Sequence, residues 1–194
     1  SKEEDPDFSP EDIRYSVIRY VASTTRNAMG PSVSDPRSGE IIESDIIWYH
    51  NHLRSYRNRF LLETGASNPN ARTLDTREED IGEMMEMVIS HEVGHALGFP
   101  HNMGASSSYE VENYRKADFT NKEGISASIM DYARFNYIAQ PGDQGVDPPG
   151  TAIVGPGAKH HHVANHRTSR FTAQHDQAGL AVRQLAPVAR IGQE

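Results

Sequence analysis

The chain of 194 residues contains no cysteine. This absence excludes disulfide bonds and thiolate ligands, so any metal site must use histidine, carboxylate or carbonyl groups. No stretch approaches the roughly 18 consecutive apolar residues of a transmembrane helix, and the acidic first residues lack the pattern of a signal peptide. The formal net charge of −8 argues against nucleic-acid binding. We therefore expect neither a membrane span nor a nucleic-acid partner.

Alternating apolar residues and turn-forming residues in the first quarter of the chain predict β-strands. Residues 13–21 alternate and are rich in β-branched and aromatic side chains, which is typical of a strand. Residues 31–48 are interpreted as two strands around a turn at 35–39, where Pro36 and Gly39 supply the bend. Together with the helices that follow them, these strands indicate an α+β fold.

Helical periodicity replaces alternation in the next part of the chain. Apolar residues at spacings of four and three over 49–65 predict an amphipathic helix. Thr76 and Glu79 match the capping-box pattern, so a long helix is expected to begin there and to continue to Leu97. A last helix is expected over 169–186, where an apolar stripe stops before a proline.

The long helix ends in the sequence HEVGHALGFPH. His91 and His95 are four residues apart, so their side chains leave one face of the helix and can bind the same ion. Glu92 is offset by one residue, which places it beside the ion as a proton acceptor without making it a ligand. Gly98 can adopt a positive φ and reverse the chain, so that His101 can complete a set of three imidazoles. Three neutral nitrogens and one open position are typical of a catalytic zinc site.

The alternative is that these histidines are ordinary surface residues, because HExxH by itself often arises by chance. Five specified positions within eleven residues are expected by chance only on the order of 10⁻⁴ of the time. Other histidines are weaker candidates. The run His160, His161 and His162 lies in a glycine- and proline-rich stretch and is interpreted as a compositional tract. His50 and His52 cannot share a helix face and are expected to be polar helix positions.

The motif resembles the signature of a known family. HEVGHALGFPH matches HExxHxxGxxH, the signature of the metzincin zinc endopeptidases. The segment SIMDY at 128–132 resembles the Met-turn that this family places beneath the zinc, with Met130 as its methionine. Tyr132 occupies the position of a tyrosine that astacin-like and serralysin-like members place near the metal. The resemblance covers about residues 12–147 and is to metalloprotease domains found in large, mostly bacterial secreted proteins.

The resemblance implies a zincin-like α+β fold. This fold has a twisted, mostly parallel sheet with an antiparallel edge strand, a long active-site helix, and an irregular C-terminal subdomain with the Met-turn and a late helix. All of 1–194 would form one catalytic domain, with subdomains 1–98 and 99–194, although residues 150–194 have no recognised counterpart. The strand and long helix that usually begin the family's domain have no counterpart before Ile13, so we expect a fragment in which this unit is missing, supplied elsewhere or cut off. The resemblance also implies an extracellular, periplasmic or cell-surface location.

The resemblance further implies hydrolysis of peptide bonds in peptides or proteins. The three histidines would bind Zn²⁺, and Glu92 would act as the general base on a zinc-bound water. Tyr132 would donate a hydrogen bond to the developing oxyanion or act as an extra ligand. An extended substrate would lie along the edge strand of the sheet, which suggests main-chain contacts at Ser32, Val33 and Ser34.

Two other functions are compatible with the same zinc site. A catalytically degenerate, zinc-binding module is the first. Glu92 argues against it because a binding role needs no base, whereas the missing first strand and helix argue for it. The second is hydrolysis of an amide in a non-peptide substrate, which the sequence does not separate from proteolysis.

Overall fold

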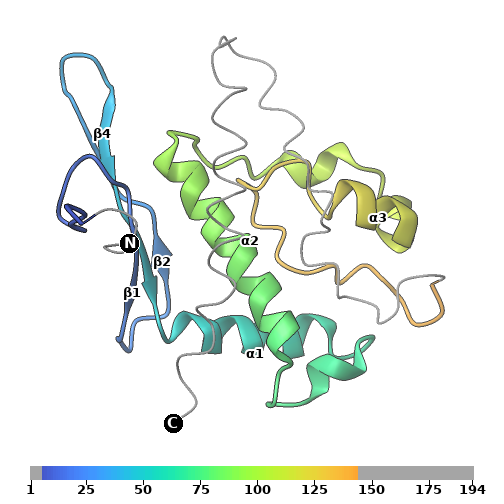
Figure 1. The fold of residues 1–194 in the computed structure, drawn as a ribbon. Coiled ribbons are helices and arrows are strands. Elements are labelled where there is room, and N and C mark those ends of the chain that lie inside the picture. The colour runs from blue at the N-terminus through green and yellow to red at the C-terminus, as the bar shows by residue number, and fades with distance from the viewer. Residues whose placement is uncertain (1–5, 144–194) are drawn as a thin grey trace.

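The computed structural model describes residues 6–143, which form an α+β fold (Figure 1). The strands are β1 (Ile18–Val21), β2 (Ala28–Met29), β3 (Ser32–Ser34), β4 (Ile41–Ser44) and β5 (Ile46–Tyr49). The α-helices are α1 (His52–Thr64), α2 (Glu78–Ala96) and α3 (Ala117–Glu123), and the 3₁₀ helices are η1 (Pro69–Arg72), η2 (Ala105–Ser108) and η3 (Val111–Arg115). The strands lie on one side of α2, and an irregular segment that carries α3 lies on the other.

The strands form two small sheets. In one, β5 pairs in parallel with β1 and antiparallel with β2, so β2 is an antiparallel edge strand. In the other, β3 and β4 form an antiparallel pair. The expected majority of parallel pairs is wrong for the described residues, where one pairing of three is parallel. The connection between β3 and β4 is too short for the crossover of about a dozen residues that parallel strands require.

Apart from β2, the observed strands fall on the segments predicted to be strands, but they are shorter than these segments. The segment 13–21 forms a strand only from Ile18, because a turn in which the Tyr15 amide bonds the Asp12 carbonyl precedes it. The segment 31–48 contains three short strands in place of two. Asp45 separates the last two, and its carboxylate accepts hydrogen bonds from the Val17 amide and the Arg19 side chain.

The long helix α2 begins in a different way from the expected capping box. Its N-cap residue is Arg77, with no side-chain cap, and the Thr76 hydroxyl is buried without a hydrogen-bond partner. The Arg77 guanidinium instead bonds the carboxylate of Asp80, which is only 2% exposed, at 2.7 Å. This ion pair and the acidic residues of the first turn stabilise the helix N-terminus.

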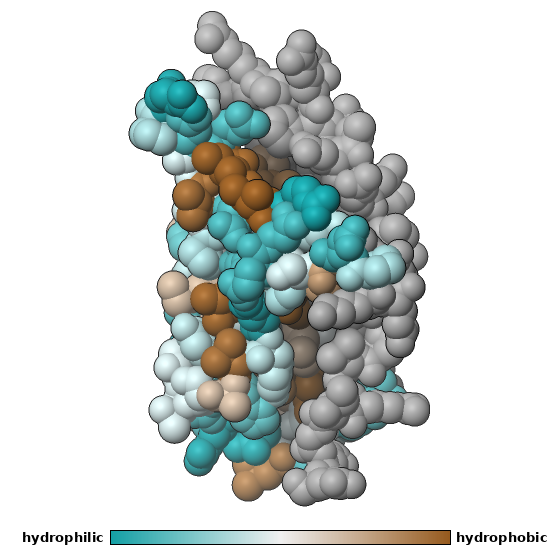
Figure 2. Space-filling model, turned by 60° about the vertical axis from the view of Figure 1, so that its left-hand side comes forward, coloured by the Kyte–Doolittle hydropathy of each residue, from teal (hydrophilic) through white to brown (hydrophobic). Residues whose placement is uncertain are grey.

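The sheet side of the molecule is partly apolar at its surface (Figure 2). Met29, Val33 and Ile42, which belong to β2, β3 and β4, are exposed. The brown groups in the view stand among hydrophilic residues. Within residues 6–143, no helix combines the length and apolar character needed to cross a membrane. The helix expected at 169–186 lies outside the described residues.

The main apolar core joins the sheet, both long helices and the segment after residue 130. Trp48 of β5, Phe60 of α1 and Met84 of α2 are each 1% exposed. Phe60 contacts Phe135, with ring centroids 5.5 Å apart. This aromatic contact fixes the irregular segment against α1 and so positions the residues that precede Phe135.

We expect Phe60→Ala to lower the free energy of unfolding by about 3–5 kcal/mol, because it removes a fully buried ring and leaves a cavity. Leu62→Ala on the same helix is the matched control. Leu62 is 82% exposed, so its truncation should change stability by less than about 0.5 kcal/mol. Urea denaturation of both variants measures the difference, and equal effects would contradict this description of the core.

Candidate metal centre

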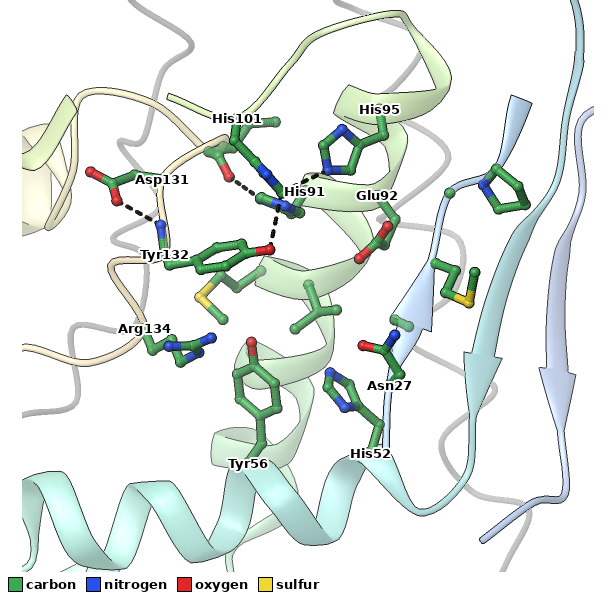
Figure 3. A pocket seen from close by; sticks show the side chains of 17 residues that line it. Asn27, His52, Tyr56, His91, Glu92, His95, His101, Asp131, Tyr132 and Arg134 are labelled. Atoms are coloured by element: carbon green, nitrogen blue, oxygen red, sulfur yellow. Dashed lines mark hydrogen bonds between the residues drawn. The ribbon is translucent and has the colours of Figure 1, made fainter. Parts of the chain in front are cut away.

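The C-terminal end of α2 brings the three histidines of the motif together. His91 and His95 lie one helical turn apart on α2. Gly98 has a φ of +89°, as the sequence predicted, and the next amide, that of Phe99, bonds back to the Gly94 carbonyl at 3.0 Å. This reversal returns His101 to the side of the helix that carries the other two histidines (Figure 3).

The spacing of the three imidazoles suits a single metal ion. One nitrogen from each of His91, His95 and His101 lies within 4.8 Å of the other two. The Nε2 atoms of His95 and His101 are 3.1 Å apart. Nitrogens bound about 2.0–2.1 Å from a tetrahedral zinc lie about 3.3–3.4 Å from one another. The His95–His101 pair is already near this separation, whereas the wider separations in the set, up to 4.8 Å, would have to shorten.

In two of the histidines, a hydrogen bond to a main-chain carbonyl determines which of the two ring nitrogens is available to a metal. His91 Nδ1 is 2.6 Å from the Ile129 carbonyl oxygen, and His95 Nδ1 is 2.9 Å from that of Phe99. A carbonyl can only accept, so each Nδ1 carries the proton and each Nε2 keeps its lone pair. Metal-binding histidines usually donate their other ring N–H to a carbonyl or a carboxylate in this way, and the hydrogen bond fixes the orientation of the ring.

Burial favours the metal-binding form of His91. Desolvation lowers the pKa of its imidazole from 6.5, and the neighbouring His95 and His101 act in the same direction. The hydrogen bond to Ile129 opposes this change. The ring therefore remains neutral, and able to bind a metal, to a lower pH than a free imidazole.

Glu92 lies beside the histidines in a largely dry setting. It is 8% exposed, and burial raises the pKa of its carboxyl above 4.5, opposed by the charge of His95 and by a hydrogen bond from the Gly30 amide. A Cβ at Gly30 would lie 2.6 Å from the Glu92 carbonyl oxygen. Only glycine allows the end of β2 to approach α2 this closely. The sequence contains no local signal for this role, because the two residues lie far apart in the chain.

The segment 128–132 packs against the histidine end of α2. Met130 is 2% exposed, and its sulfur contacts Gly94 so closely that a Cβ there would overlap with it. Its carbonyl accepts a hydrogen bond from the Asn102 amide at 2.9 Å. The Tyr132 hydroxyl lies 3.1 Å from His101 Nε2. Met130 and Tyr132 thus lie at the end of α2 that carries the histidines.

A cleft of about 380 Å³ opens beside the histidines. Its walls come from the β2 segment, α1, α2 and the residues after Met130, and they include Asn27, Gly30, His52, Tyr56 and Arg134. For His52 the sequence favoured a polar helix position over a place in the cleft. The sequence did not single out Tyr56 or Arg134 for a site, because the fold brings their elements together over long separations.

The predicted substrate contacts at Ser32, Val33 and Ser34 do not line this cleft. All three residues are exposed on β3, which pairs with β4 and not with the sheet next to α2. The preceding residues 27–31 form the cleft wall instead, because β2 pairs with β5 and its end lies against Glu92.

A family model described as Met-zincin matches residues 73–156. The matched segment contains α2, all three histidines and the segment 128–132. The match supports a metzincin-type family. Neither the curated proteins nor the solved structures gave a match to the chain. A metzincin-type family implies a metal cofactor, typically zinc, and a function of the metallopeptidase kind, in agreement with the histidine cluster.

We expect the chelator-treated protein to bind one zinc at the three-histidine site, and His101→Ala to weaken that binding by at least about tenfold, because it removes one of three ligands. His50→Ala is the control, because His50 bonds Tyr20 and does not line the cleft. Isothermal titration with zinc measures both variants. Unchanged affinity in His101→Ala would exclude His101 as a ligand.

Proposed function

We propose that the protein is a zinc-dependent endopeptidase that uses His91, His95 and His101 to hold the metal. The observation that carries this proposal is the combination at one cleft of three imidazole nitrogens within 4.8 Å and a buried glutamate beside them. A purely structural metal site would need no carboxylate of this kind next to an open position.

The chemistry follows from the surroundings of each group. A zinc ion held by the three histidines would lower the pKa of a coordinated water toward 7 and polarise a peptide carbonyl. Glu92 accepts a proton from the attacking water and returns it to the leaving amine. Burial raises the pKa of Glu92, which brings its basicity closer to that needed near neutral pH. The Gly30 amide holds the carboxylate in place.

Tyr132 is suited to assist when negative charge develops on the carbonyl oxygen. Its side chain lies beside His101 at the mouth of the cleft and is partly exposed, so its hydroxyl can reach a bound substrate. A hydroxyl donor in this position stabilises the transition state more than the ground state.

The edge strand β2 offers a binding surface for an extended peptide. β2 pairs with β5 on one side only, and its residues line the cleft. A peptide added along 27–31 would bring a backbone carbonyl past the histidines by strand addition. This open, strand-bordered cleft favours a peptide over a compact non-peptide amide as the substrate.

Glu92→Gln should retain zinc and fold but lose peptide hydrolysis by at least about 10²-fold, because glutamine cannot accept a proton. Glu86→Gln, an exposed position on the same helix, is the matched control and should remain active. Hydrolysis of a mixed peptide library and zinc content are measured for both. A Glu92→Gln protein that cleaves at the wild-type rate would contradict the assigned role.

Tyr132→Phe should lower kcat by up to about 10²-fold with little change in zinc content, because the lost hydroxyl contributes mainly in the transition state. Steady-state kinetics on one cleaved peptide and metal analysis test this expectation. A loss of zinc in the variant would instead make Tyr132 a ligand, and unchanged kinetics would remove it from the reaction.

A further inference from the structure

A single permanent cation lies in the cleft beside the histidines. Arg134 lines this cleft, and among its described lining residues it is the one lysine or arginine. The guanidinium carbon lies 5.0 Å from the centroid of the Tyr132 ring, and the Tyr132 hydroxyl lies 3.1 Å from His101 Nε2. The cation is therefore separated from the metal ligands by one side chain.

Within residues 6–143, no ion pair involves Arg134. The two acidic residues that line the cleft are Glu92 and Asp131. Asp131 accepts a hydrogen bond from the Ser106 amide at 2.7 Å, and Glu92 accepts one from the Gly30 amide. Each carboxylate is thus oriented by other groups, and the guanidinium remains without an anionic partner from the described chain.

The charge of Arg134 acts on the groups around the cleft. It contributes to lowering the pKa of His52, whose main cause is burial, and so favours the neutral imidazole. It also opposes the effect of burial that raises the pKa of the Tyr56 hydroxyl. The guanidinium therefore acts as a nearby positive charge on both of these side chains.

Polar side chains surround the same space. Figure 3 shows the guanidinium of Arg134 directed toward the hydroxyl of Tyr56, with His52 and Asn27 on the opposite side. Met87 and Val88 of α2 add apolar surface. The guanidinium, the hydroxyl and the Asn27 amide next to this apolar surface are suited to bind a short side chain that ends in a carboxylate, which is a planar anionic acceptor.

We propose that Arg134 binds a carboxylate of the peptide substrate in this cleft, so that the enzyme selects peptides with a carboxylate near the cleaved bond. The carboxylate comes from an aspartate or glutamate side chain, as in cleavage within a chain, or from a free C-terminus, in which case the cleavage is that of an exopeptidase. This inference rests on the proposed peptidase function, and it adds the substrate class. A planar guanidinium can bond a carboxylate through two parallel hydrogen bonds, which distinguishes a carboxylate from its neutral amide.

Arg134 has one other role to be separated from this one, which is to hold the Tyr132 ring by a cation–π contact. A residue that only positions Tyr132 would affect all substrates alike. A residue that binds the substrate carboxylate would affect acidic peptides alone.

The first test measures binding without turnover. Fluorescent octapeptides, identical except for glutamate or glutamine at one scanned position and amidated at the C-terminus, are titrated into zinc-loaded Glu92→Gln protein. A third series carries glutamine and a free C-terminal carboxylate. At one position or at the free terminus, the acidic peptide should bind about tenfold or more tightly than its neutral partner, the usual scale for a hydrogen bond between charged groups.

Variants at two arginines in the same background identify the source of the preference. Arg134→Gln should remove the preference, and Arg134→Lys should keep part of it. Arg59→Gln is the matched control. Arg59 also acts electrostatically on His52 and Tyr56, but it pairs with Glu63 and does not line the cleft. Equal binding of acidic and neutral peptides, or a preference that survives Arg134→Gln, would overturn the proposal.

Cleavage of the same peptides by the wild-type protein separates the two proposals. If acidic peptides bind selectively but nothing is cleaved, the peptidase function fails and the carboxylate site stands. If acidic and neutral peptides are cleaved equally and Arg134→Gln slows both alike, the peptidase function stands and Arg134 only positions Tyr132.

Discussion

Two hydrogen bonds from histidine rings to main-chain carbonyls constrain the whole site. His91 Nδ1 bonds the Ile129 carbonyl, and His95 Nδ1 bonds that of Phe99. These contacts assign the protons to Nδ1 and direct both Nε2 atoms toward His101. They also join α2 to the two segments that carry the remaining parts of the site, the turn at Gly98 and the residues around Met130. The metal site and the packing of the chain therefore depend on the same interactions.

The rest of the site depends on two other parts of the chain, β2 and the segment around Met130, which pack closely against the C-terminal end of α2. Gly30 lets the end of β2 contact Glu92, and Gly94 makes room for the Met130 sulfur. The first contact helps to bury Glu92, and this burial raises the pKa of its carboxyl, while the hydrogen bond from the Gly30 amide opposes the change. The second places Tyr132 next to His101. Two glycines thus bring a strand and an irregular segment against one helix and leave a cleft between them.

The local parts of this arrangement could be predicted from the sequence. The histidine spacing and the helix are periodic over a few residues, and the positive φ at Gly98 follows from the need to reverse the chain. The neighbourhood of Met130 and Tyr132 was accessible only through the family resemblance, because it joins segments far apart in the chain. Non-local features were missed or misplaced. The capping box at Thr76 was a local error, because Arg77 is the N-cap residue and pairs with Asp80 three residues later.

The cleft was the least predictable part of the structure. Its walls depend on which strands pair, and the short β3 pairs with β4 while β2 stays beside α2. The predicted peptide contacts at Ser32, Val33 and Ser34 were therefore displaced by a few residues from the segment 27–31 that lines the cleft. Arg134 and His52 carry no local pattern that marks them as neighbours of a metal.

The most direct test of the central claim is a crystal structure of the zinc-loaded protein, with anomalous diffraction measured at the zinc edge to locate the ion. The account predicts an anomalous peak bound by the Nε2 atoms of His91, His95 and His101 at about 2.0–2.1 Å, with Glu92 outside the coordination shell. A peak only at other residues, or imidazole rings directed away from one another in the presence of zinc, would contradict it.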